Sequence, residues 1–119
     1  MRVLGVCFLV IAALAWPSSV KAGSNPGSEE VQFGMEAARR GLWEEARFRF
    51  EKAVSIEPDN TAALNNLAIA FEQQGDFAKA REAYEKALKL KPGNMYIQQN
   101  FDLFKEADEK RNRKAKKKP

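Results

Sequence analysis

The sequence has no histidine and one cysteine, Cys7. A chain from which the segment around Cys7 is removed has no thiol nucleophile, no imidazole base and few ligands for transition metals. It is also indifferent to an oxidising compartment. No Gly-rich phosphate loop or nucleophile elbow is present. The adjacent carboxylates Glu29-Glu30 and Glu44-Glu45 would point about 100° apart on a helix, which is poor geometry for an acid/base pair. We therefore expect a protein that is not an enzyme and holds no cofactor or metal.

Long apolar runs are also scarce. The one at the start of the chain, from Val3 to Trp16, falls short of the roughly 20 apolar residues that a helix needs to span a bilayer comfortably. With the short basic start and the small residues that follow, it predicts a signal peptide at residues 1–22 that is cut after Ala22. Export to the periplasm or the medium is therefore expected, and an uncleaved membrane anchor is the alternative. Residues 23–26, rich in Gly, Ser, Asn and Pro, are predicted to be a flexible linker.

Two stretches of the chain, residues 27–60 and 61–94, have equal length and repeat each other position by position. In the second stretch, apolar residues recur every three or four positions on both sides of Gly75, which predicts two helices joined by a turn. Gly41 stands at the same place in the first stretch. The further matches are Phe33-Gly34 with Leu67-Ala68, Trp43 with Phe77, Ala46 with Ala80, Phe50 with Tyr84, Ala53 with Ala87, and Pro58 with Pro92.

A period of roughly 34 residues, with a two-helix unit and small residues at fixed positions, resembles the tetratricopeptide repeat (TPR). The second repeat follows the family pattern at Leu64, Leu67, Ala68, Phe71, Ala80, Tyr84 and Pro92. The first repeat departs from it at Glu30 and Ala37, where a large apolar residue is usual, so its first helix (about Glu29–Arg40) is predicted to pack less firmly. The resemblance implies an all-α solenoid of two repeats with a non-catalytic role, presenting a concave groove to a peptide or partner protein.

Residues 95–109 are predicted to form a capping helix that packs on the second repeat through Ile97, Phe101 and Phe104. The positions that would receive a further hairpin are polar: Gln98, Asp102 and Lys105. The stack is therefore expected to end here, since solenoids need a terminal cap with a polar outer face.

Residues 110–119 are predicted to be a mobile basic tail. Its basic residues are Lys110, Arg111, Arg113, Lys114, Lys116, Lys117 and Lys118. Residues 23–109 hold 11 Lys and Arg against 16 Asp and Glu, a net charge of −5, so the basic balance of the chain comes from this tail and the signal. A solvated tail is one interpretation, and attraction to anionic lipid or an acidic partner is the other. Nucleic acid is not expected, because export removes the protein from it and no aromatic residue lies among the basic ones.

By the resemblance, the first helix of each hairpin lines the concave groove. The implied groove positions are Val31, Met35, Arg39, Asn65, Ile69, Gln73, Gln99 and Leu103, with Ala107 at the end of the last trio. Met35, Ile69 and Leu103 follow one another at intervals of one repeat length and predict an apolar row across three helices. The alternative is that this row packs as core.

Some family members bind terminal carboxylates with a basic clamp, of which only Asn66 is matched here. The departures stand at Val31, Met35, Tyr96 and Asn100. The resemblance thus implies an apolar or mixed peptide, or a partner helix, as the ligand and not an acidic tail. The other interpretation of the chain is a structural or assembly subunit of a larger envelope complex. The oligomeric state is left open.

Overall fold

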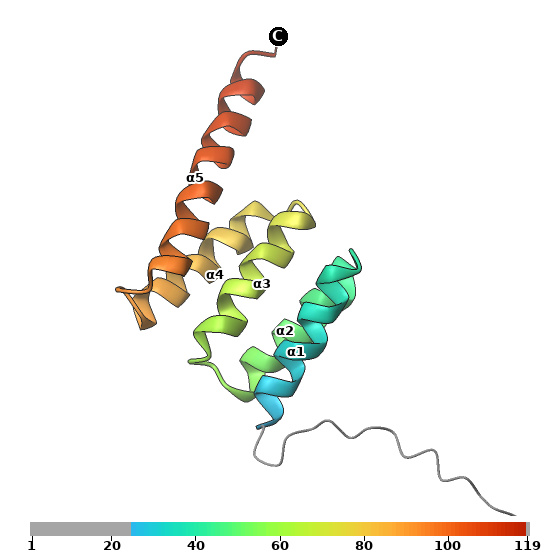
Figure 1. Ribbon diagram of the computed structural model, residues 1–119. Coiled ribbons are helices and arrows are strands. Elements are labelled where there is room, and N and C mark those ends of the chain that lie inside the picture. Colours follow the sequence, from blue (N-terminus) through green and yellow to red (C-terminus); the bar gives the residue numbers. More distant parts are fainter. Residues whose placement is uncertain (1–24, 119) are drawn as a thin grey trace, which may run out of the picture.

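The computed structural model describes residues 25–118, which form five helices and no strand (Figure 1). The helices are α1 (Pro26–Arg39), α2 (Trp43–Ile56), α3 (Thr61–Gln73), α4 (Phe77–Leu90) and α5 (Met95–Lys116). Helices α1 and α2 form one hairpin, α3 and α4 form a second, and α5 lies at the opposite end of the stack from α1. The predicted all-α repeat fold is confirmed. The expected signal peptide, residues 1–22, lies outside the described residues.

A glycine with a positive φ angle turns the chain in each hairpin. The φ angle is 74° at Gly41 and 79° at Gly75. This left-handed conformation is open to glycine at little cost, because a Cβ atom would clash with the backbone. The two glycines that the repeat aligned therefore have the same physical role.

Small and aromatic residues at matched positions form the core of each hairpin. Ala46 and its counterpart Ala80 are completely buried, and the exposed fractions of Phe50 and Tyr84 are 2% and 1%. In the first hairpin the two helices approach so closely that a Cβ atom added to Gly34 would lie 2.5 Å from the ring of Phe50. The glycine in α1 is therefore required by helix packing and not by a turn.

The start of α1 differs from the prediction, because the helix begins at Pro26 inside the expected linker. The side chain of Asn25 accepts a hydrogen bond from the backbone N–H of Ser28 at 2.8 Å. Proline is favoured at the first position of a helix, since its missing N–H would have no partner there. These two residues begin the helix where composition alone predicted flexibility.

The end of α5 also differs, because the helix continues through the expected mobile tail to Lys116. Residues 95–118 contain no glycine or proline, and Lys and Arg are good helix formers. Pairs one turn apart support the extension: Lys110 with Glu106 at 3.1 Å and Arg113 with Glu109 at 3.9 Å. Cations in the last turn also interact favourably with the helix dipole.

Helix α5 packs on α4 through an aromatic cluster. The ring of Tyr84 lies 5.6 Å from that of Phe101 and 5.5 Å from that of Phe104, measured between centroids. Phe104 is 1% exposed. Rings at these separations attract one another beyond their burial alone. The apolar face of α5 therefore covers the end of the second repeat.

Three polar residues on the outer side of α5 bond to one another. Gln98 donates a hydrogen bond to Asp102 at 2.9 Å, and Lys105 pairs with the same carboxylate at 3.1 Å. The hydrogen bond from Lys105, with that from Gln98, holds the pKa of Asp102 below its ordinary value. This surface, the C-terminal face, consists of Gln98, Asp102 and Lys105 and replaces the apolar residues that would receive a further hairpin. Met95 and Leu103 are exposed beside it.

Neighbouring residues of α5 offer a direct test of this packing. Phe104→Ala should lower the free energy of unfolding by about 3–5 kcal/mol, because it removes a buried aromatic ring and leaves a cavity. Leu103→Ala is the control, since Leu103 is 62% exposed and its truncation should change stability by less than about 0.5 kcal/mol. Urea unfolding followed by circular dichroism measures both. Equal costs for the two variants would contradict the packing described here.

Candidate functional site

A small apolar hollow lies where α1, α2 and α3 meet, with a volume of about 220 Å³. Its lining residues are Met35, Ala38, Arg39, Trp43, Phe50, Asn66 and Ile69. All are apolar except Arg39 and Asn66. The hollow is smaller than the pockets that usually hold a drug-sized ligand or cofactor. Its size and lining suit one apolar side chain of a bound peptide or helix.

Three of the predicted groove residues line this hollow. Met35 and Ile69, which occupy the same position in successive repeats, come together in it, and Arg39 lies beside them. Met35 is 46% exposed, so its side chain is open to a ligand, whereas Ile69 is partly buried. The Arg39 guanidinium pairs with Glu36 at 3.1 Å, and both side chains are largely exposed. Arg39 is thus held near the hollow without being buried in it.

Two other predicted groove residues are in the core, which corrects the prediction for them. Val31 is 9% exposed and packs in the main apolar cluster. Asn65 is 1% exposed, and its side-chain oxygen accepts a hydrogen bond from Asn100 of α5 at 3.2 Å. The Asn65 amide therefore joins α3 to the capping helix and is not available to an extended peptide. A buried amide with a partner of this kind contributes to the fold.

The remaining predicted positions do not join the hollow. Gln73 is exposed at the end of α3. Gln99 and Leu103 line a different hollow of about 380 Å³, all of whose lining residues belong to α5. The predicted apolar row therefore holds for Met35 and Ile69 but does not continue to Leu103. The repeat spacing does not carry over to α5, which has no second helix of its own repeat to hold it in register.

Four of the seven lining residues were not among the predicted groove positions, and two of these four are aromatic. Trp43 and Phe50 come from α2, whereas the resemblance assigns the groove to the first helix of each hairpin. Trp43 stands two residues after the turn glycine Gly41, at the first position of α2. This position in the sequence could have predicted that Trp43 lines the hollow, since a large side chain just after the turn lies beside the end of the preceding helix.

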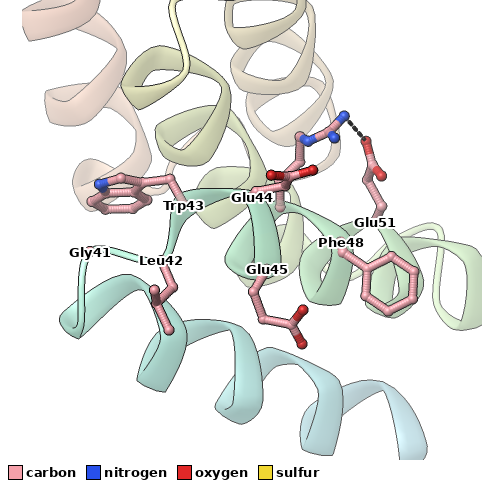
Figure 2. A pocket seen from close by; sticks show the side chains of 8 residues that line it. Gly41, Leu42, Trp43, Glu44, Glu45, Phe48 and Glu51 are labelled. Atoms are coloured by element: carbon pink, nitrogen blue, oxygen red, sulfur yellow. Dashed lines mark ion pairs between the residues drawn. The ribbon is translucent and has the colours of Figure 1, made fainter.

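A wider and more open depression of about 880 Å³ surrounds the start of α2. Figure 2 shows Trp43 and Phe48 at its two ends, with Glu44 and Glu45 between them. Two of its carboxylates are neutralised within α2: Glu51 by Arg47 at 3.6 Å and Glu45 by Arg49 at 2.7 Å. This depression is therefore less acidic than its carboxylates suggest.

The basic residues at the C-terminus form a second candidate site because they lie on a helix. Figure 1 shows the end of α5 projecting beyond the other four helices. Lys110, Arg113, Lys114 and Lys117 follow the three- and four-residue spacing of one helical face. Arg111 differs from them: its guanidinium lies 3.4 Å from the centroid of the Phe77 ring, a cation–π contact with α4.

A carboxylate next to this contact holds the start of the basic segment on the repeats. Asp108 pairs with Arg81 of α4 at 3.0 Å and with Arg111 at 3.1 Å. The hydrogen bond from Arg81, helped by that from Arg111, holds the pKa of Asp108 below its ordinary value, although burial opposes this effect. Arg111 is therefore held on the repeats, whereas Lys110 and the basic residues after Arg111 are exposed.

The tetratricopeptide repeat family model matches residues 31–94, which is more than half of the chain. The protein therefore belongs to the tetratricopeptide repeat family. Repeats of this family are typically non-catalytic modules that bind other proteins on an extended concave surface. A search of curated proteins found no match.

Neither metal binding nor a membrane span is visible in the described part of the chain. Residues 25–118 contain no group of three or more side chains that could hold a metal ion. None of the five helices is both long and apolar enough to cross a membrane.

The Asp108 ion pairs predict a pH-dependent contribution to stability. Because the folded-state pKa is lowered, the contribution is present above the unfolded-state value of about 4 and is lost as the pH falls through the folded-state value. Asp108→Asn should lower the free energy of unfolding at pH 7 by about 1 kcal/mol, allowing for solvent screening of the partly exposed Arg81. The deficit should shrink as the pH falls below about 4.

Glu109→Gln is the matched control for this prediction. Its side chain is 71% exposed and lies 3.9 Å from Arg113, so it should have almost no effect. Urea unfolding at several pH values measures both variants. A deficit for Asp108→Asn that stayed constant down to acid pH would show that the loss is not electrostatic.

Proposed function

We propose that this protein is a non-catalytic adaptor that works outside the cytoplasm and binds a peptide or partner helix through the hollow between α1, α2 and α3. The observation that carries the proposal is the composition of the hollow. Met35, Trp43 and Ile69 offer apolar and aromatic contacts, and Arg39 and Asn66 add one cation and one amide at its edge. Aromatic residues and Met in a concave site, with a few polar groups, are typical of protein recognition surfaces.

This chemistry favours an apolar anchor residue over an acidic tail. Among the seven lining residues, Arg39 is the one cation, and it is paired with Glu36. One partly neutralised guanidinium gives little affinity for a carboxylate-rich peptide in water. An apolar side chain would instead displace water from the surface of Met35 and Ile69, which is favourable in proportion to the apolar area covered.

The extracellular or periplasmic setting rests on the sequence. The basic start, the short apolar run and the small residues before Gly23 support removal of a signal peptide after Ala22. The mature chain would then have no cysteine or histidine, so an oxidising compartment would not alter it.

A photo-crosslinking amino acid in place of Met35 should join the protein to its partner in the envelope fraction of the source cells. The same amino acid in place of Leu103, an exposed apolar residue outside the hollow, is the control and should give no such product. Ile69→Glu in the Met35-labelled protein should lower the crosslinking yield at least tenfold, because a carboxylate would be desolvated by the ligand.

The fold of each variant is checked by circular dichroism. Equal crosslinking from positions 35 and 103 would contradict the groove proposal. Unfolding of the Ile69→Glu protein would show that Ile69 belongs to the core, and the hollow would then have no role in binding.

The second candidate is an assembly subunit whose basic helical segment contacts anionic lipid or an acidic partner. The observation that favours it is the exposed stripe of Lys110, Arg113, Lys114 and Lys117 at the projecting end of α5. Within residues 25–118, Lys114 and Lys117 form no ion pair with a carboxylate. Each basic residue near an anionic membrane surface contributes about 1 kcal/mol to binding.

Replacement by glutamine of the exposed cations that follow Arg111 tests this second candidate. The variant changes Arg113, Lys114, Lys116, Lys117 and Lys118 and keeps Arg111 on Phe77. It should keep its melting temperature but lose binding to phosphatidylglycerol vesicles, and the parent's binding should weaken as salt is added. Vesicles of phosphatidylcholine alone are the control. Equal binding by parent and variant would exclude an electrostatic contact of the segment with lipid.

A further inference from the structure

The second repeat shows how a hairpin of this protein is covered on its N-terminal side. Leu67 and Phe71 of α3 and Ala83 of α4 line a common hollow with Glu51 and Val54 of the preceding helix α2. Leu67 and Phe71 are both only 7% exposed. The contact between α2 and the second hairpin therefore shows what kind of contact the equivalent surface of the first hairpin can make.

The same positions one repeat earlier form a surface that no described residue covers in this way. We call it the N-terminal face: Glu30 and Phe33 of α1, and Glu45, Phe48, Arg49 and Lys52 of α2. Phe33, the counterpart of Leu67, is 56% exposed, and Phe48 is 55% exposed. Exposed apolar side chains that gather on one surface, unlike those scattered singly, mark interaction sites.

The charges of the N-terminal face balance one another. Glu30 is 8% exposed and pairs with Lys52 at 2.6 Å and with Arg49 at 3.3 Å. Arg49 also binds Glu45 at 2.7 Å. Its guanidinium lies 5.4 Å from the ring centroid of Phe33 and 5.8 Å from that of Phe48, so it links the two aromatic residues. The face thus has two exposed rings and two carboxylates balanced by two cations.

The two ends of the stack are unlike, which restricts how copies could associate. The C-terminal face carries a bonded polar network, in which Asp102 binds Gln98 and Lys105, and the exposed side chains of Met95 and Leu103 lie beside it. A head-to-tail contact would set Phe33 and Phe48 against this bonded network, whereas two N-terminal faces match each other in both polarity and charge.

We infer that the N-terminal face binds the N-terminal face of a second copy and forms a two-fold symmetric dimer. Because the face has no net charge, two copies meet without net repulsion, and a two-fold axis lets the cations of one copy approach the exposed carboxylate of Glu45 in the other. Burial of Phe33 and Phe48 supplies the apolar contact. None of the residues of this face lines the hollow at Met35 and Ile69, so the inference does not depend on the proposed function.

The test uses the protein as an exporting host makes it from the full gene, with the N-terminus read by intact mass. Sedimentation equilibrium from low to high micromolar concentration should show a monomer–dimer equilibrium. Phe33→Gln with Phe48→Gln should raise the dimer dissociation constant at least tenfold, a change of about 1.4 kcal/mol. Both side chains are more than half exposed, so thermal melting should show a retained fold.

Leu103→Gln is the control, because it makes the same type of change on an equally exposed residue at the other end of the stack. It should leave the dissociation constant unchanged. The single change Phe48→Gln, with a smaller rise, serves if the double variant unfolds.

Three results would overturn the inference. A monomer at every concentration would do so, as would a dimer that the phenylalanine changes leave intact. By the repeat spacing, residues 17 and 20 correspond to Glu51 and Val54 and precede the described part of the chain. The third result is a monomer whose intact mass shows that residues 1–22 are retained. In that case the N-terminal face would be covered by the chain's own N-terminal segment and not by a second copy.

Discussion

The contacts of one buried tyrosine hold three of the five helices together. Tyr84 of α4 is 1% exposed, its ring packs on Phe101 and Phe104 of α5, and its hydroxyl donates a hydrogen bond to Glu72 of α3. Burial, together with that carboxylate, raises the pKa of Tyr84 above its ordinary value, so the phenol stays protonated and remains a donor. A two-repeat solenoid is short for an independent fold, and this contact lets α5 act in place of a third repeat.

The repeat spacing predicted the fold because it reports positions where only certain residues fit. Gly41 and Gly75 need a positive φ angle, and Phe50 needs the absence of a side chain opposite it at Gly34. Side chains at the ends of the stack were harder to predict, because a periodic pattern assumes neighbours that the end helices lack. The repeat position of Asn65 predicts a groove amide, because the pattern does not show that Asn100 of α5 donates a hydrogen bond to it.

Local chemistry at the helix termini was misjudged for a related reason. Composition predicted a linker before α1 and a mobile tail after Glu109, but composition does not report hydrogen bonds between specific neighbours. Asn25 caps α1, and Lys110 bonds Glu106 one turn earlier in α5.

The candidate site was predicted in part: Met35 and Ile69 meet as expected, whereas Trp43 and Phe50 enter from the second helix of the hairpin.

The continuity of α5 affects how its cations could bind. A disordered tail must lose backbone freedom when it meets a surface, at a cost of roughly 1–2 kcal/mol for each residue that becomes fixed. Residues up to Lys116 have already lost that freedom on folding, and Arg111 on Phe77 fixes the direction in which the segment leaves the repeats. Lys116 then lies about 7–8 Å further along the helix axis. The basic segment is therefore preorganised as a rigid extension of the repeats. A contact at its end would fix the distance and orientation of the hollow between α1, α2 and α3 relative to the surface that the segment binds.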